Sequence, residues 1–442
     1  MKYKQLTVLL VFLLILPLFL NYNLTSKAAT TTTSPGFFLG VDVAYESVSL
    51  TEQLIDNVSS YTNAFIIGCN GNNNLTRLNI ISQYVYDKGL SFIVYSDYPK
   101  YPSAQWLADA KNNWGNRFLG IYYSDEPGGK QLDQAKYPAV TTATNYSDAA
   151  INYVQSVNAY LRSGLFSITN NFAYPTEFPL FTSDYALYWY DYQAGYDTVF
   201  AEFALNYDRT LNLDLIRGAA TAQNKDWGIM ITWKYTQPPY MESGMELYND
   251  MVLAYENGAK YIFVFDSNKD WTQNVLTQSQ LDAIKEFWQY TQANPRTVTP
   301  VSDRIAYVLP DDYAYGFRGP EDKIWGLWQA DNLTVDISMS IKTLMQICGN
   351  NLDIVYPDGL QTVQSVGYKS IIYWNDSSLI PNVPTTQSPS PIISSTTPHR
   401  TQQELSWLSY PIIIYIYAIA AGILATFAIT NSVLKVRRKR GG

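Results

Sequence analysis

Between residues 37 and 298 the sequence alternates short apolar runs with longer helical stretches, and this alternation limits the fold more than any other feature. Strands that alternate with helices form a parallel sheet covered by helices. Eight such units within this length predict an α/β fold, a closed (β/α)8 TIM barrel, and no phosphate-binding glycine loop supports an open doubly wound sheet. The eight strand-like runs are residues 37–45, 64–70, 90–97, 118–126, 165–171, 198–206, 227–235 and 261–268.

A shorter α/β pattern follows the barrel. Strand-like runs at 304–310, 352–357 and 368–374 surround one helical run at 334–349. This length is too short for a second barrel and predicts a small layered domain. We therefore expect the barrel over residues 30–298 and the small α/β domain over residues 299–378.

Both ends of the chain carry targeting patterns. Residues 1–29 combine two lysines, an apolar run and small residues before Ala28, which is typical of a cleaved secretory signal peptide. Residues 410–434 are apolar over the length of a membrane-spanning helix, and a buried core helix is the alternative. The basic tail at 435–442 predicts a cytoplasmic C-terminus. We expect a single-pass membrane protein whose N-terminal part is extracellular, held off the membrane by a Pro/Ser/Thr-rich stalk at 379–409.

An extracellular location affects how cysteines and asparagines are interpreted. Cys69 and Cys348 can form a disulfide in an oxidising exterior, but the sequence does not fix their distance, and the pairing stays open. Beyond the expected signal peptide, five glycosylation sequons make the chain a candidate glycoprotein, although an individual sequon is a weak signal. They begin at Asn57, Asn74, Asn145, Asn332 and Asn375.

The composition excludes several classes of function. Acids outnumber bases by 38 to 30, and many of the bases lie in the C-terminal tail, so nucleic acid is not an expected partner. The one histidine, His399, lies in the stalk, which removes Ser-His-Asp hydrolysis and histidine-ligated zinc from the barrel. With two cysteines in the chain, soft metal sites are also disfavoured. We expect no cofactor and no metal.

Acidic residues follow most of the predicted strands. TIM barrels place catalytic groups at the carboxyl ends of their strands. Hydrolysis of a glycosidic bond needs only two carboxyl groups, one that holds a proton and one that is ionised. The candidate acids are Asp42, Asp97, Asp125, Glu126, Glu202 and Asp266.

The stretch GIYYSDEPGG at residues 120–129 resembles the strand-four signature of glycoside-hydrolase-like barrels, in which an Asn-Glu or Asp-Glu pair ends the strand. The resemblance implies that Glu126 is the proton donor and that Asp125 orients or binds the sugar. Pro127 then stops the strand, and the two glycines allow the backbone to approach a ligand. The alternative is a polar turn without catalytic function.

The second carboxylate is harder to assign. Many such hydrolases carry their nucleophile on strand seven, but the run WGIMITWKY at 227–235 has no acid, which departs from that pattern. Glu202 is the nearest candidate on the barrel interior. A structural ion pair of Glu202 with Lys234 or Arg209 is the alternative. Asp42 and Asp266 are further candidates that can equally serve as structural caps.

Sugar binding is expected from aromatic rings and polar groups at the same strand ends. Flat rings pack against the apolar faces of pyranoses while hydroxyl groups bond to acids and amides. With 37 tyrosines in the chain, an aromatic cluster is also consistent with ordinary core packing. The expected substrate-binding residues are Asp125, Asp42, Asp97, Trp233, Lys234 and Asp266.

The densest motif of the second unit is residues 304–328. This stretch resembles the small flavodoxin-like domain that follows the barrel in some β-galactosidase-type hydrolases. Asp311, Asp312 and Arg318 can project a loop over the barrel mouth, or they can form a local turn network. No nucleotide-binding fingerprint is present.

Together these features predict a membrane-anchored extracellular glycoside hydrolase that acts on polysaccharide or glycan through Glu126 and Glu202. The alternative is a non-catalytic glycan-binding or cell-surface structural protein on a hydrolase-like barrel. The low charge, abundant tyrosine and sequons also resemble surface proteins of acid-living archaea. The sequence leaves the sugar, the linkage, the stereochemical outcome and the oligomeric state open.

Overall fold

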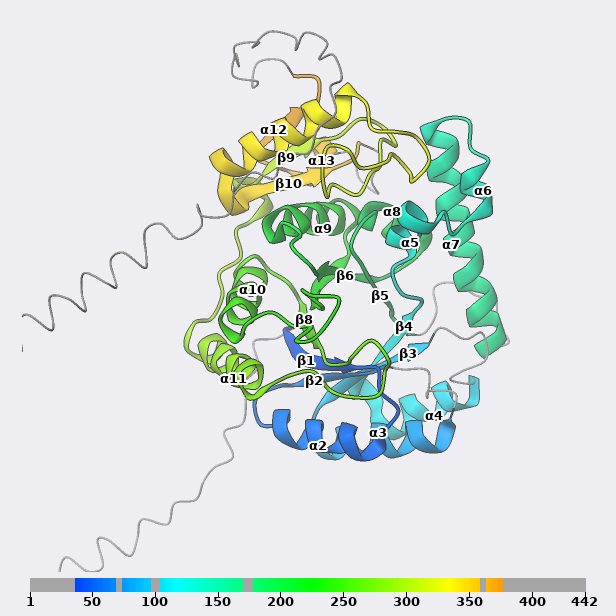
Figure 1. Cartoon of the computed structure of the whole chain (residues 1–442), viewed down its shortest axis with the longest axis vertical. Helices are drawn as coiled ribbons and strands as arrows, with labels where there is room; N and C mark the ends of the chain where they lie inside the picture. The colour runs from blue at the N-terminus through cyan, green and yellow to red at the C-terminus, as the bar shows by residue number, and fades with distance from the viewer. Residues whose placement is uncertain (1–35, 69–73, 97–103, 170–177, 358–362, 377–442) are drawn as a thin grey trace, which may run out of the picture. The chain divides into compact units, whose positions relative to one another are not determined.

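A computed structural model describes residues 36–376, apart from 69–73, 97–103, 170–177 and 358–362. Eight parallel strands close into a barrel in chain order, each paired with its neighbours and β8 paired with β1 (Figure 1). The predicted TIM barrel is therefore confirmed. Its strands are β1 Phe38–Val43, β2 Ala64–Ile67, β3 Ser91–Ser96, β4 Phe118–Tyr123, β5 Leu180–Asp184, β6 Thr198–Phe203, β7 Asp226–Ile231 and β8 Tyr261–Phe265.

Helices surround the strands and bury one apolar face each (Figure 1). In α10, for example, Leu247, Met251 and Ala254 recur at helical spacing and are buried. A capping box between Ser243 and Glu246 fixes where this helix begins. The helices are α2 Val48–Val58, α3 Leu75–Asp87, α4 Ala104–Trp114, α5 Pro127–Gln134, α6 Pro138–Thr141, α7 Tyr146–Thr169, α8 Tyr188–Ala194, α9 Arg209–Gln223, α10 Gly244–Glu256 and α11 Gln278–Ala293, and a 3-10 turn at Gly115–Arg117 precedes β4.

The fifth strand differs from the prediction. The run at 165–171 was expected to be a strand, but residues 165–169 continue α7, and β5 lies at Leu180–Asp184. Tyr153, Val157 and Leu161 are buried at four-residue spacing, so helical packing governs this region. Gly164 inside α7 is tolerated because a glycine costs a helix only about 1 kcal/mol.

Side chains that point into the barrel divide it into two levels. Because side chains alternate along a strand, every second residue faces the interior. The lower level is a packed apolar core in which Phe181, Phe200, Tyr261 and Phe263 contact one another or neighbouring rings. Within the described part of the barrel, this core fills the lower level, and the cavity lies at the mouth, at the carboxyl ends of the strands.

A three-stranded parallel sheet follows the barrel, in the order β10-β9-β11. Asp353 of β10 is fully buried and accepts hydrogen bonds from Arg217 of α9 at 2.7 Å and from Arg304 at 2.7 Å. This pairing fixes the sheet against α9. The elements are β9 Ile305–Val308, α12 Asn332–Cys348, β10 Leu352–Val355, α13 Val363–Val366 and β11 Ser370–Tyr373, with 3-10 turns at Val301–Asp303 and Gly349–Asn351. The boundary at 298/299 and the flavodoxin-like assignment remain predictions.

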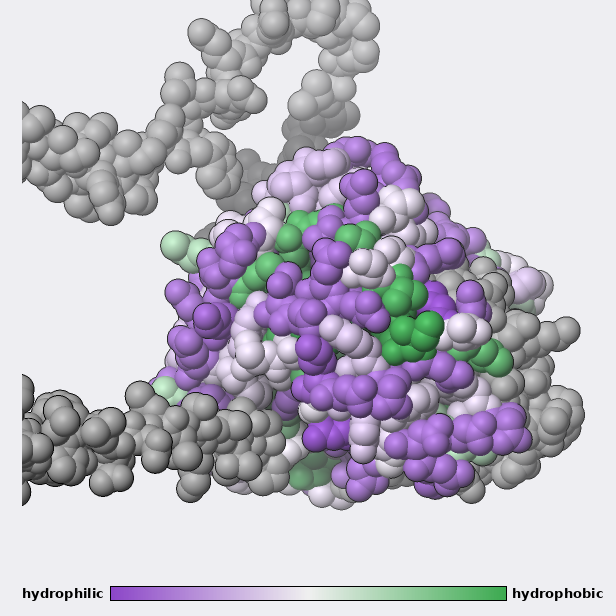
Figure 2. Space-filling model, turned by 90° about the horizontal axis from the view of Figure 1, so that it is seen from below, coloured by the Kyte–Doolittle hydropathy of each residue, from purple (hydrophilic) through white to green (hydrophobic). Residues whose placement is uncertain are grey.

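Several predictions lie outside the described residues: the signal peptide, the stalk, the membrane helix at 410–434, the basic tail, and Cys69 of the proposed disulfide. Within the described part of the chain, no helix combines the length and apolar character needed to cross a membrane. The five sequon asparagines are exposed. The face seen in Figure 2 is mostly hydrophilic, with small hydrophobic patches.

Candidate active site

A cavity of about 440 Å³ occupies the mouth of the barrel. Its floor is made by inward-facing residues at the carboxyl ends of the strands, one layer above the apolar core. This volume falls within the roughly 300–1,000 Å³ typical of small-ligand pockets. The lining residues are Asp42, Ala44, Gly68, Tyr95, Tyr122, Asp125, Glu126, Lys130, Ser183, Glu202, Met230, Thr232, Trp233, Phe265 and Trp271.

The turn between β4 and α5 carries Asp125 and Glu126 into this cavity. Ser124 and Glu126 both adopt left-handed backbone conformations, with φ of 61° and 49°. Such conformations are unfavourable for residues other than glycine and persist only where the surroundings hold them. Here the Glu126 N–H donates to the Ser183 carbonyl at 3.0 Å.

Asp184 fixes the start of α5. Its buried carboxyl group accepts backbone hydrogen bonds from Gly128 at 2.5 Å and from Gly129 at 2.9 Å, as well as from two residues of its own loop. An acid at a helix N-terminus satisfies N–H groups that have no partner within the helix. The rigid turn that results presents Glu126 to the cavity.

The glycines of the motif have a different role from the one expected. We expected them to let the backbone approach a ligand, but they pack against the β5–α8 segment. A Cβ atom at Gly129 would lie 2.0 Å from the Tyr185 ring, and one at Gly128 would lie 2.7 Å from the Ala186 carbonyl oxygen. The two glycines therefore allow close packing inside the protein rather than ligand contact.

Ser183 joins two of the cavity carboxyl groups. Its hydroxyl group lies 2.6 Å from Glu202 Oε1 and 3.2 Å from Asp125 Oδ1. The Tyr122 hydroxyl group donates to Asp125 Oδ1 at 2.5 Å and lies 2.7 Å from Ser183 Oγ. Asp125, Ser183 and Glu202 thus form one hydrogen-bonded group across β4, β5 and β6, beside Glu126.

The electrostatics of the cavity favour protonated acids. Among the described residues that line it, Lys130 is the single cation, and its Nζ lies 3.6 Å from Asp125 and 3.5 Å from Glu126. Burial, followed by the charge of Asp125, raises the pKa of Glu126 to about 7. Burial and the charges of Glu126 and Asp125 raise the pKa of Glu202 well above its ordinary value. A set of close carboxyl groups with one cation cannot be fully ionised at neutral pH.

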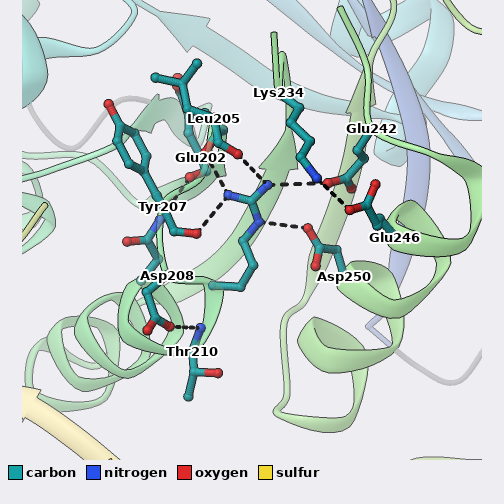
Figure 3. A network of polar contacts seen from close by, with 12 residues as sticks. Glu202, Leu205, Tyr207, Asp208, Thr210, Lys234, Glu242, Glu246 and Asp250 are labelled. Carbon is teal, nitrogen blue, oxygen red and sulfur yellow. Dashed lines mark hydrogen bonds and ion pairs between the residues drawn. The ribbon is translucent and has the colours of Figure 1, made fainter. Parts of the chain in front are cut away.

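Glu202 does not form the structural ion pair that was the alternative explanation for it. Arg209 instead contacts Asp250 at 2.9 Å and Glu242 at 3.4 Å, and Lys234 contacts Glu246 at 2.5 Å (Figure 3). The described contact of the Glu202 carboxyl group is with Ser183. This side chain is therefore available to the cavity.

Asp42 and Trp233 complete the cavity wall. Asp42 is 6% exposed, and its Oδ1 has no hydrogen-bond partner among the described residues. Burial, followed by the charge of Asp125, raises the Asp42 pKa well above its ordinary range. Trp233 stacks on Trp271 with ring centroids 5.8 Å apart. The two indoles provide an apolar part of the cavity wall, which is suited to the face of a sugar ring.

Three expected binding residues are not brought to the described part of this site. Asp266 is fully buried and accepts backbone hydrogen bonds from Val275 and Leu276, because it is next to the inward-facing Phe265 and so points away from the barrel interior. Lys234 is used in its ion pair with Glu246 and does not line the cavity. Asp97 lies outside the described residues.

Sequence reasoning did not single out Tyr122, Lys130, Ser183 or Trp271 as site residues, although all four line the cavity. Alternation along β4 could have identified Tyr122. Every second residue of a strand faces the same side, and Tyr122 lies two residues after the inward-facing Gly120. Ser183 was hidden because β5 was placed too early. Lys130 is one helical turn after Glu126 and faces it for that reason.

Among the described residues, no group of three or more His, Cys, Asp or Glu side chains has a geometry that could hold a metal ion.

Comparisons with known proteins add little beyond the fold. No protein-family model matches the chain, and no curated protein is matched by sequence. Among solved structures, it is similar to a β-mannanase from the blue mussel Mytilus edulis, at 10% identity and a TM-score of 0.38 over 60% of this chain and 94% of that chain. It is also similar to a family 1 β-glucosidase from Thermotoga maritima, at 10% identity and a TM-score of 0.35 over 59% of this chain and 98% of that one.

A 3-hexulose-6-phosphate synthase is similar to the same extent, at 12% identity and a TM-score of 0.30 over 57% of this chain and 99% of that chain. At such identities and TM-scores, these likenesses support no conclusion about family or activity. The barrel itself is established by the strand pairing described above.

Proposed function

We propose that this protein hydrolyses glycosidic bonds in a polysaccharide or glycan, with Glu126 as the acid that protonates the leaving oxygen. One observation carries the proposal. Glu126, whose pKa is raised to about 7, faces the same cavity as Glu202 and Asp125 at the open mouth of the barrel. Two carboxyl groups in different protonation states are the minimum required for this reaction.

The residues divide the chemistry between them. Glu126 gives its proton to the glycosidic oxygen, and the bond from that oxygen to the anomeric carbon breaks. The second carboxyl group, which we assign to Glu202, must lose its proton before this step, and as a carboxylate it then either attacks the anomeric carbon or takes a proton from the attacking water. The hydroxyl group of Ser183 orients Glu202 and links it to Asp125. Trp233 and Trp271 hold the sugar ring against the acids.

The proposal also places this activity outside the cell on a membrane-anchored protein. The support comes from the sequence, through the signal-like N-terminus, the stalk and the apolar run at 410–434.

The test is the release of reducing sugar by the full-length protein from a panel of polysaccharides between pH 3 and 8. We expect release from at least one polysaccharide and a loss of about 100-fold or more in Glu126→Gln, since a general acid typically contributes 10²–10⁴-fold. Glu286→Gln, which makes the same change at an exposed acid of α11, is the matched control. Full activity in Glu126→Gln would remove Glu126 from this role.

A non-catalytic glycan-binding protein is the second candidate function. The observation in its favour is that β7 contributes Met230 to the cavity, followed by Thr232 and Trp233, and no acid. Binding of a glycan without release of reducing sugar from any member of the panel would favour this alternative.

A further inference from the structure

A second cavity lies where the residues after β9 meet the start of α9. Its volume is about 180 Å³, and its walls come from residues 206–212, from 315–320 and from α12. We propose that this cavity is a distal subsite for the same carbohydrate chain, so that the substrate is an oligosaccharide or polysaccharide rather than a single sugar. The inference rests on the proposed function and specifies its substrate.

The residues after β6 connect this distal cavity to the candidate active site. Tyr207 and Asn212 line the distal cavity, and the side-chain amide of Asn212 donates to the backbone carbonyl of Glu202 at 3.1 Å. The Tyr185 ring lies 6.2 Å from the Tyr207 ring, and Tyr185 directly follows Asp184, the last residue of β5. One wall of the distal cavity therefore lies directly beyond the end of β6, the strand that carries Glu202.

Arg318 builds that wall and is held rigidly in place. Its guanidinium group makes bonds of 3.0 and 2.8 Å to Asp322 and of 2.9 Å to Asp133, and it lies over the Tyr185 ring. Arg318 therefore forms a local network with Asp322, one of the two alternatives that the sequence left open, and also contacts Asp133 of α5 and the Tyr185 ring. Because two acids compensate the charge of Arg318, and because the other charged lining residues, Asp208 and Lys342, have opposite signs, the cavity is suited to a neutral ligand rather than an anion.

The rest of the distal cavity combines apolar rings with hydrogen-bonding groups. Phe317 is half-buried and stacks on Tyr315 with ring centroids 4.0 Å apart. Tyr207 and Asn206 add polar groups beside it. This combination matches a sugar, which has an apolar face and hydroxyl edges. The volume is below that of a typical drug-sized pocket, so a single ring of a longer chain is the expected occupant.

The experiment measures binding as a function of chain length. Full-length Glu126→Gln, in which turnover is disabled, is titrated calorimetrically with cello-, manno- and xylo-oligosaccharides of one to six units. We expect affinity in one series to increase with length beyond the units that fill the main cavity. Adding Phe317→Ala should weaken binding of the longest chain by about 3- to 10-fold, the range for losing one aromatic contact, and leave the shortest chain unchanged.

Two further variants guard against a folding artefact. Lys342→Trp changes an exposed residue of the cavity lining and narrows the cavity without opening the core, so the same selective loss is expected. Trp374→Ala removes a partly exposed ring that follows β11, outside the lining of the distal cavity, and binding should be unchanged.

Affinity that does not depend on chain length, or an equal loss for short and long chains, would overturn the distal subsite. In that case hydrolysis that depends on Glu126 would still support the proposed function. If no oligosaccharide binds, the distal subsite is overturned, and the wild-type polysaccharide assay then decides the proposed function separately.

Discussion

Two acid clusters lie near the mouth of this barrel, and their electrostatics are similar. In the cavity cluster, Glu126 has a pKa raised to about 7, and in the cluster around Arg209, Glu242 has a pKa raised to about 8. Burial is the main cause in both. A raised pKa is therefore insufficient to mark a functional acid.

The two clusters differ in what surrounds the acids. Arg209 contacts Glu242 and Asp250 and also donates to the backbone carbonyls of residues 204, 205 and 207, which ties the β6–α9 loop to α10 (Figure 3). None of these groups lines the cavity. Glu126 and Glu202 face open space with Lys130 as the nearby cation. Exposure of the acids to an open cavity, and not a raised pKa alone, therefore distinguishes the candidate active site from a structural network of ion pairs.

The largest expected effect compares the same substitution in each cluster. Glu202→Gln should reduce the rate of glycan hydrolysis by about 100-fold or more, because a neutral amide can neither attack nor accept a proton. Glu242→Gln should leave the rate within about twofold. Both changes replace a buried glutamate with a side chain of equal size, so a difference in initial rate reflects the loss of the carboxyl group rather than a change in packing. The reverse order would mean that the site lies at the Arg209 cluster.

The second comparison concerns stability. Arg209→Met removes the cation from between Glu242 and Asp250, and breaking a buried pair in this way typically costs about 3–5 kcal/mol. Lys130→Met removes a partly exposed cation whose ion-pair distances are 3.6 and 3.5 Å and which donates a hydrogen bond to the Asp125 carbonyl at 2.8 Å, so it should cost about 1 kcal/mol. Urea unfolding measures both free energies. Equal losses would contradict the division into a structural and a functional cluster.

The third prediction is that the protein is more stable in acid than at alkaline pH. In the folded chain the pKa values of Glu126 and Asp184 are about 7 and that of Glu242 is about 8, whereas the ordinary values of these side chains are 4.5, 3.8 and 4.5. Between about pH 4 and 8 the folded state therefore binds more protons than the unfolded state, and stability falls as the pH rises through this window.

The melting temperature should accordingly be higher at pH 5 than at pH 8. Glu246, with a pKa lowered to about 2, acts in the opposite direction, but its contribution is lost only as the pH falls below about 4. Glu126→Gln and Glu242→Gln should each reduce the pH dependence. A melting temperature that rises from pH 5 to pH 8 would show that these acids are not protonated in the folded chain.

The smallest expected effect is on the pH profile of activity. The charge of Lys130 lowers the pKa of Glu126, so Lys130→Met should raise it and move the alkaline limb of the rate profile to higher pH. Lys234→Met, in the structural cluster, should leave that limb in place. If Lys234→Met moves the alkaline limb and Lys130→Met does not, the limb reports the titration of an acid other than Glu126.

The sequence predicted the barrel because seven of its eight strands are apolar runs separated by clear helical patterns. The fifth was misplaced because the apolar run at 165–169 belongs to a helix, while the true strand LFTSD carries polar residues that resemble a turn. That one error concealed Ser183, which bridges the carboxyl groups, and Asp184, which holds α5.

The site could be predicted where the alternation of side chains along a strand decides whether a residue faces the cavity or points outward. Asp42 and Glu202 face the cavity, whereas Asp266 is next to an inward-facing residue and points outward. The partners of Arg209 could not be predicted, because they lie 33 and 41 residues away on another loop and helix. Such contacts depend on how the loops and helices pack together, which no local pattern encodes.

The most direct test of this account is the titration of the Glu126 carboxyl group itself. Carbon-13 NMR of protein labelled at the glutamate carboxyl carbons, with Glu126→Gln to assign the signal, measures its protonation midpoint. The account predicts a midpoint of about 7. A midpoint near the ordinary glutamate value of about 4.5 would show that Glu126 is ionised at neutral pH and would contradict its role as the proton donor.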